Sequence, residues 1–153
     1  MTTTGSTTAT TAPPGTIVVG VDGSKASLAA LGWAVHQAEL TGAAVEVVAC
    51  WQWPSSTGWS PPVPDDYRPD LVAETALSEI VDTARRQNPS VAFRPKVMEG
   101  PPARALVEAS ADADLLVVGS RGHGEFAGML LGSVSEHCVT NAHCPVLVYR
   151  GRA

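Results

Sequence analysis

Five short apolar runs, separated by segments with helical periodicity, constrain the fold of this chain more than any other feature. The first run, TIVVGV at residues 16–21, is continuous and rich in β-branched residues, which is typical of a strand buried on both faces. The others are AVEVVACW at 44–51, the alternating apolar residues of 91–97, LLVV at 115–118 and PVLVY at 145–149. Strands that alternate with helices build a parallel sheet, because the helices supply the crossover connections.

Four helices are predicted between these strands. The expected caps are Ser24 and Gly42 at the two ends of the first helix, Asp70 for the second, Pro101-Pro102 for the third, and a capping box over Ser133–Glu136 for the fourth. The expected buried side chains are Leu28, Leu31, Val35 and Ala38; Ala73, Leu77, Ile80 and Ala84; Leu106 and Val107; and Val134, Cys138 and Ala142.

The predicted fold class is α/β, a single doubly wound, Rossmann-like domain with helices on both faces of a five-stranded parallel sheet. Right-handed crossovers favour the strand order 3-2-1-4-5. Pro95 cannot donate a hydrogen bond to a neighbouring strand, so the third strand is expected at an edge. The strand order reverses between the first and fourth strands, and a ligand crevice should open at their carboxyl ends.

Length and composition indicate one domain of 153 residues with a net charge of −5. Residues 1–15 are rich in Thr and lack Leu, Ile and Val, so we expect a disordered tail before a domain at 16–153. The acidic balance argues against a nucleic-acid binder, and no apolar run reaches the ~20 residues of a membrane span. Three cysteines and the absence of a signal-peptide pattern favour the cytoplasm.

Two tracts should meet at the crevice. The first, Gly20–Ser24, leaves the first strand, and the second, Gly119–Ser135, leaves the fourth. Glycines allow backbone N–H groups to converge on an anion, and the helix that follows presents its positively polarised N-terminus. Phosphate is therefore the expected ligand of this tract. The alternative is a surface loop in which the glycines only allow the backbone to turn.

The spacing Gly119-x2-Gly122-x9-Gly132-Ser133 resembles the nucleotide-binding signature of the universal stress proteins. The resemblance extends over residues 16–150 through VGVDGS, DLLVVGSRG, LLGSVSEH and HCPVLV. It implies an ATP-binding stress-response or signalling module that carries Mg²⁺ on the phosphates. It also implies a homodimer formed through the last strand, at Val146, Leu147 and Val148.

The resemblance also assigns site residues by position. The implied phosphate and ribose cradle is Gly119, Ser120, Arg121, Gly122, His123 and Gly124, completed at the helix start by Gly132, Ser133, Val134 and Ser135. Asp22 is placed near ribose and adenine, with Gly20 and Val21 along the base. Cys50 occupies a position where the family usually has Val, so only a backbone contact to the adenine edge carries over.

No nucleophile–base pair is evident, so any ATP hydrolysis is expected to be slow. One alternative is a nucleotide-free interaction module, or one that binds AMP or cyclic AMP. Another is an adenine-nucleotide α-hydrolase-type enzyme, which would place its phosphate loop after the first strand. The sequence VDGSKAS at that point resembles such a loop only weakly. Asp22 could also accept a phosphoryl group or simply cap a turn.

Other motifs carry less weight. His137-Cys138 and His143-Cys144 lack the two-to-four-residue gaps within ligand pairs that zinc sites show. GHGEFA at 122–127 follows the fourth strand, whereas a dinucleotide fingerprint follows the first. A segment rich in Trp and Pro after the second strand is expected to be a lid over the base or a cover on the end of the sheet, with a partner surface as a third reading.

Overall fold

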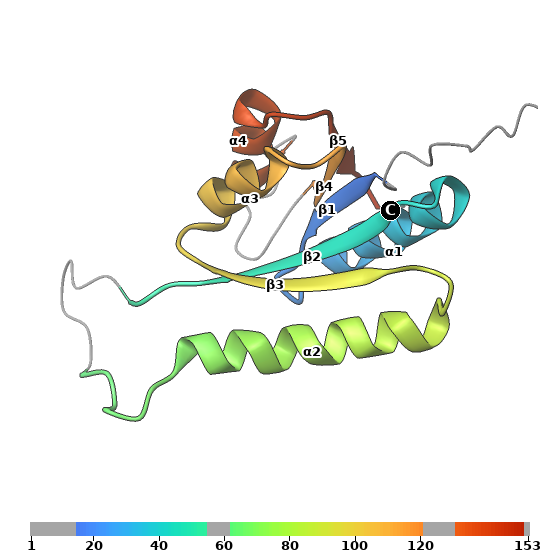
Figure 1. The fold of residues 1–153 in the computed structure, drawn as a ribbon. Helices are drawn as coiled ribbons and strands as arrows, with labels where there is room; N and C mark the ends of the chain where they lie inside the picture. Colours follow the sequence, from blue (N-terminus) through green and yellow to red (C-terminus); the bar gives the residue numbers. More distant parts are fainter. Residues whose placement is uncertain (1–14, 55–61, 121–130, 152–153) are drawn as a thin grey trace, which may run out of the picture.

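The computed structural model describes residues 15–54, 62–120 and 131–151. Its elements alternate strictly between strand and helix (Figure 1). They are β1 (Thr16–Gly20), α1 (Lys25–Thr41), β2 (Ala44–Trp51), α2 (Pro69–Gln87), β3 (Phe93–Glu99), α3 (Pro102–Ser110), β4 (Leu115–Gly119), α4 (Ser133–Asn141) and β5 (Val146–Tyr149).

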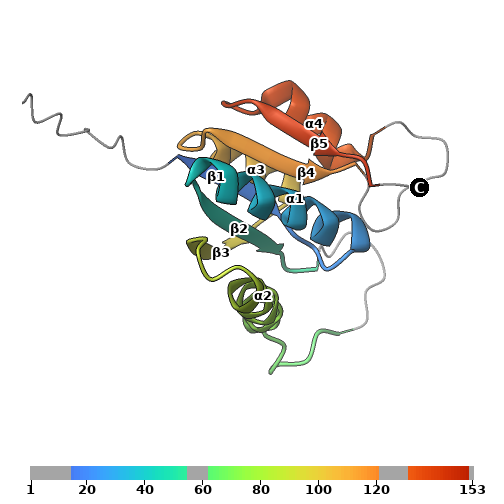
Figure 2. The ribbon, with the colours of Figure 1, turned by 90° about the vertical axis from the view of Figure 1, so that its right-hand side faces the viewer.

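The five strands form one parallel sheet in the order β3-β2-β1-β4-β5, as predicted. β3 lies at an edge, and Pro95 is paired with Val47 of β2 on its inner side. The helices form two layers: α1 and α2 cover one face, and α3 and α4 cover the other (Figures 1 and 2). The central strands are therefore shielded on both faces, which explains their continuous apolar sequences.

Alternate residues of each strand belong to different cores. Val45 and Val47 of β2 pack beneath α1 and α2, whereas Val48 packs with Leu106 of α3 and Leu116 of β4. This alternation follows from the two-residue period of a strand. It also determines which side chains at the end of β2 project toward α2 and which project toward α3.

The caps of α1 are confirmed, but its buried stripe differs from the prediction at Leu28 and includes additional small residues. The Ser24 side chain accepts a hydrogen bond from the Ser27 amide, and Gly42 closes the helix with φ of 77°. Leu28 was expected in the core and is 41% exposed, whereas Ala30 and Ala34 are fully buried. Leu28 instead lines a groove between α1 and α2.

Two predicted helix starts are wrong. α2 begins at Pro69 after Arg68, so Asp70 lies in the first turn and pairs with the Arg68 guanidinium at 2.9 Å instead of capping the helix. α4 has Gly132 as its N-cap and makes no side-chain cap bond, so the capping box at Ser133 does not form. Gly132 already has extended φ and ψ, which makes Ser133 the first helical residue.

The chain is described from Gly15 onward, so residues 1–14 of the predicted tail lie outside the described residues and the boundary at residue 16 stays a prediction. The Gly15 carbonyl accepts a hydrogen bond from the Ala44 amide, and the Thr16 amide donates to the Asp114 carboxylate at 2.7 Å. In the three described ranges, no helix is both long enough and apolar enough to cross a membrane.

Candidate functional site

A pocket of about 90 Å³ opens at the carboxyl ends of β1 and β4, where the strand order reverses. It is lined by Gly20, Val21, Asp22, Ser27, Val48, Cys50, Pro102, Leu106, Val118, Gly119, Gly132, Val134 and Ser135. The fold therefore joins the two tracts that the sequence separates by about a hundred residues. Eight predicted site residues lie in this lining: Gly20, Val21, Asp22, Cys50, Gly119, Gly132, Val134 and Ser135.

Six other predicted residues have different positions. Ser120 and Ser133 adjoin the pocket in sequence but are not in its lining. Arg121, Gly122, His123 and Gly124 lie outside the described residues. Their assignment to a phosphate cradle stays a prediction.

Hydrogen bonds within a tight turn organise the first tract. The Asp22 Oδ1 atom accepts a hydrogen bond from the Ser24 amide at 2.9 Å, so the turn-capping role weighed for this residue is present. The Asp22 amide donates to the Ser27 hydroxyl at 3.2 Å, and that hydroxyl donates to the Ser24 carbonyl. These bonds hold Asp22 at the rim of the pocket, where its side chain contributes to the lining.

Backbone bonds close the base of the second tract. The Gly132 amide donates to the Ser120 carbonyl at 2.7 Å, and the Ser120 amide donates to the Tyr149 carbonyl at 3.0 Å. The buried Ser135 hydroxyl lies 3.0 Å from the Gly132 carbonyl and 3.3 Å from that of Ser120. The hydroxyl donates its proton to these carbonyl oxygens, so toward a ligand Ser135 would act only as a hydrogen-bond acceptor.

The N-terminus of α4 faces this pocket, because Gly132, Val134 and Ser135 all contribute to its lining. The first intrahelical bond runs from the Glu136 amide to the Gly132 carbonyl. The preceding amides at Ser133, Val134 and Ser135 belong to the first turn, whose N–H groups have no partner within a helix. Together with the helix dipole they favour an anion at this end of the pocket.

The opposite wall is apolar and was largely missed by sequence reasoning. Val48, Leu106 and Val118 form it with Pro102 and the Cys50 side chain. The alternation of β2 could have pointed to Val48, because it lies two residues before Cys50 on the same face. Leu106 comes from α3, and no local pattern connects that helix to the two glycine tracts.

Two of the three pocket glycines, Gly20 and Gly119, have packing reasons of their own. A Cβ atom at Gly20 would lie 2.8 Å from a Leu106 methyl group, and one at Gly119 would lie 3.0 Å from the backbone of Ala26. The end of β4 therefore touches the first turn of α1 directly. Close approach of protein backbone is sufficient to require glycine at position 119.

We expect Gly119→Ala to destabilise the domain by about 1–3 kcal/mol, because the Ala26 backbone must move to admit the methyl group. Gly32→Ala is the matched control: nothing lies within 4 Å of its Cβ position, and alanine in a helix stabilises by about 0.5–1 kcal/mol. Urea unfolding of both variants measures the difference. Equal stability of the two variants would contradict the close contact.

Burial raises the pKa of the Cys50 thiol, at the pocket, to about 11. Burial, with a smaller contribution from the charge of Cys50, raises the pKa of Cys138 to about 11 as well. Both cysteines are therefore neutral thiols at physiological pH. This chemistry suits an apolar wall and not a nucleophile.

We expect these thiols to make the fold less stable between pH 9 and pH 11. Below pH 9.0, the ordinary thiol value, Cys138 is protonated in both the folded and the unfolded chain. Above it the unfolded chain ionises while the folded chain does not, so stability falls by up to about 1.4 kcal/mol per pH unit for this fully buried thiol. Urea titrations at several pH values should show a shallower slope for the Cys50→Val, Cys138→Ala double variant, and an unchanged slope would contradict the prediction.

The described tryptophans that follow the core of β2, Trp51 and Trp53, do not line this pocket. Trp51 lies on the face of β2 that carries Val45 and Val47, opposite Cys50. Trp59 lies outside the described residues. Because residues 55–61 also lie outside the described residues, the lid, the cover and the partner surface all stay predictions.

No group of three or more His, Cys, Asp or Glu side chains in the described part of the chain is placed to hold a metal ion. A larger groove of about 620 Å³ runs between α1 and α2, with Leu31, Val35 and Ala84 among its lining residues. It contains none of the predicted site residues.

Comparison with known proteins agrees with this geometry. The family model described as Universal stress protein family matches residues 14–150. Universal stress protein Rv2624c of Mycobacterium tuberculosis H37Rv is 37% identical over 138 residues, which are 90% of this chain and 48% of the relative. Rv2623 of the same strain is 38% identical over 134 residues, covering 88% of this chain and 44% of the relative. The chain thus spans about half the length of these curated relatives.

Solved structures show the same fold. A universal stress protein in complex with cAMP has a TM-score of 0.67 and 30% identity, and the match covers 92% of this chain and 99% of that one. UspA from Lactobacillus plantarum has a TM-score of 0.69 at 22% identity, with 91% of this chain and 99% of that chain covered.

Proposed function

Because this chain belongs to the universal stress protein family, we propose that it binds an adenine nucleotide in the pocket between β1 and β4. One observation carries the proposal: the fold brings an apolar wall, the Asp22 carboxylate and the start of α4 together around one opening. Nucleotides require these three features, since they consist of a flat apolar base, a ribose with hydroxyl donors and an anionic phosphate. The relative solved with cAMP, at 30% identity, supports the adenine class.

The base is proposed to lie against Val48, Cys50 and Leu106, with backbone atoms near Cys50 reading its edge. The pocket of about 90 Å³ is smaller than the ~300–1,000 Å³ of a typical ligand site, so it suits the base alone. The ribose would then lie beside Asp22 at the pocket rim, where the resemblance to the family also places it.

The phosphates are proposed to extend from the pocket toward the N-terminus of α4. There the amides of Ser133 and Val134, in the first turn of α4, would donate to an anion, and the hydrogen bond from Gly132 to Ser120 joins the two ends of the glycine tract. Arg121, Gly122, His123 and Gly124 would complete the cradle. A tract of this length favours ATP over a monophosphate, because it offers amides to more than one phosphate group.

Mg²⁺ would be held mainly by the phosphate oxygens and water. This is the usual mode for the ion, which keeps several waters and takes few protein ligands. The described residues fit that mode, because they offer a carboxylate at Asp22 and no preformed metal cluster. When bound, the ion would neutralise phosphate charge.

The proposed role is a nucleotide-dependent stress-response or signalling module of the cytoplasm, with at most slow hydrolysis. We also propose a homodimer through β5, an edge strand whose residues Val146, Leu147 and Val148 are only half-buried in the single chain. An apolar strand with an open edge favours pairing with a second copy.

Heat release of bound nucleotide from the purified chain, read by mass spectrometry, tests the proposal. Calorimetric titration with ATP–Mg²⁺, AMP and cyclic AMP then ranks the ligands. Tightest binding of ATP–Mg²⁺ supports ATP as the ligand. Tightest binding of AMP or cyclic AMP supports the pocket as an adenine-nucleotide site but contradicts ATP as its ligand. No binding of any of the three would favour the nucleotide-free alternative.

A further inference from the structure

A row of three aromatic rings, the half-buried Trp51 and the exposed Trp53 and Tyr67, connects the end of β2 with the start of α2. The rings of Trp51 and Trp53 meet edge to face with centroids 5.9 Å apart, and those of Trp53 and Tyr67 do the same at 6.3 Å. Trp53 is 52% exposed and Tyr67 is 39% exposed. We call Trp51, Trp53 and Tyr67 the aromatic patch.

Exposed apolar side chains concentrate in the stretch of sequence that holds Trp53 and Tyr67. Among the described residues eight large apolar side chains are exposed, and five of them lie between positions 53 and 72: Trp53, Val63, Tyr67, Leu71 and Val72. Single exposed apolar residues are ordinary on a protein surface, but a concentration of them marks an interaction site. Trp, Tyr and Arg, all present here, are also the residue types that dominate binding energy at interfaces.

The aromatic patch is separate from the nucleotide pocket. Trp51 is paired in register with Glu99 of β3, so both side chains project from the sheet face that α2 covers. Cys50, which lines the pocket, projects from the opposite face. The patch therefore stays accessible whether or not the pocket holds a ligand.

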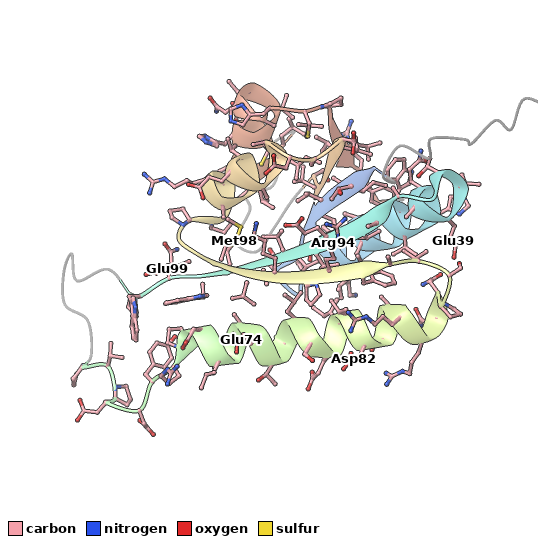
Figure 3. The ribbon with its side chains drawn as sticks, in the orientation of Figure 1. Glu39, Glu74, Asp82, Arg94, Met98 and Glu99 are labelled. Carbon is pink, nitrogen blue, oxygen red and sulfur yellow. The ribbon has the colours of Figure 1, made fainter. Side chains whose placement is uncertain are left out.

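Carboxylates neighbour the patch in sequence and in strand register. Asp65 and Asp66 form the turn before Tyr67, Asp70 and Glu74 lie near Arg68, and Glu99, labelled in Figure 3, is paired in register with Trp51 at the end of the sheet. The Arg68 guanidinium is the one cation among residues 62–75, and it is already paired with Asp70 through two hydrogen bonds of 3.1 and 2.9 Å. The patch is thus apolar at its centre and negatively charged at its rim.

We propose that the aromatic patch is a docking surface for a basic, partly apolar segment of a partner protein. Arginine or lysine side chains of that segment would stack on the exposed face of Trp53 and pair with the rim carboxylates, while its apolar residues cover Tyr67, Leu71 and Val72. A second copy of this chain is a poorer occupant, because symmetric contact would place two acidic rims against each other.

The test uses the full chain without nucleotide and a short synthetic peptide in which arginine and leucine alternate. Indole fluorescence and NMR shifts of the tryptophan N–H groups follow the titration. We expect saturable binding that weakens with added salt, and at least about a tenfold loss of affinity for Trp53→Ala. Leu40→Ala is the matched control, since Leu40 is also exposed but lies on α1, and it should bind like the wild type.

Charge and apolar contact are separated by two further peptides, one with glutamate for arginine and one with serine for leucine. Both should bind more weakly than the arginine–leucine peptide. Asp65→Asn with Asp66→Asn should weaken binding of that peptide without changing the circular dichroism of the fold.

Three outcomes overturn the proposal. The first is no binding of the arginine–leucine peptide, and the second is equal binding by Trp53→Ala. The third is self-association in sedimentation that Trp53→Ala removes, which would make a second copy the occupant. None of these depends on nucleotide, so a failure here is distinct from a failure of the nucleotide proposal.

Discussion

Cys50→Phe is expected to weaken adenine-nucleotide binding by about a hundredfold, or about 2.8 kcal/mol. The Cys50 side chain is half-buried and lines the pocket beside Val48 and Leu106. A phenyl ring there would occupy the space proposed for the base. Because the side chain already reaches the open pocket, the ring can be accommodated without displacing the core. Calorimetric titration of the variant with ATP–Mg²⁺ measures the loss.

Two further variants make this result specific. Cys144→Phe introduces the same ring at a half-buried cysteine just before β5, at the other end of the sheet, and should bind nucleotide like the wild type. Cys50→Val keeps the backbone at this position and should change affinity by less than about threefold, since only the backbone is proposed to read the base. Full affinity in Cys50→Phe would place the nucleotide elsewhere on the molecule.

Leu116→Ala is expected to destabilise the domain by about 3–5 kcal/mol. Leu116 is fully buried in β4, paired with Val18 on one side and Val146 on the other, beneath the layer formed by α3 and α4. Neighbouring strands hold the backbone on both sides, so the cavity left by the missing methyl groups cannot collapse. A loss of this size is a large part of the ~5–15 kcal/mol that stabilises a typical domain.

Urea unfolding followed by circular dichroism measures this change. Val139→Ala is a suitable control, because Val139 is an exposed apolar residue of α4 and its truncation should alter stability by less than about 0.5 kcal/mol. A loss below about 1 kcal/mol for Leu116→Ala would mean that the two-layer core tolerates cavities, contrary to its close packing.

The two cores also explain how the chain separates its proposed activities. The Cys50 side chain of β2 projects toward the α3 face of the sheet and lines the pocket. The side chain of the next residue, Trp51, projects toward α2 and belongs to the aromatic patch. The pocket and the aromatic patch therefore lie on opposite faces of the sheet at the end of β2. A ligand at one surface need not obstruct a partner at the other.

Much of the fold was predictable from local sequence. The strand order, the edge position of β3 and the Ser24 and Gly42 caps of α1 follow from apolar runs, from Pro95 and from residue preferences at helix ends. Local signals were less reliable at the start of α2 and of α4. There Asp70 and Ser133 have the right chemistry for a cap, but the preceding backbone places them inside the helix.

The candidate site was predictable where its residues lie in the two glycine tracts, because a parallel sheet must bring the ends of β1 and β4 together. The contribution of Leu106 and Pro102 was not, since it depends on how α3 packs across the strand ends. The sequence by itself determined the order of the sheet and the place of the crevice, because periodicity and chain connectivity are local and topological. Only the tertiary structure decided which side chains share that crevice, and that Trp51 points away from it, because side-chain direction depends on register and on packing between distant elements.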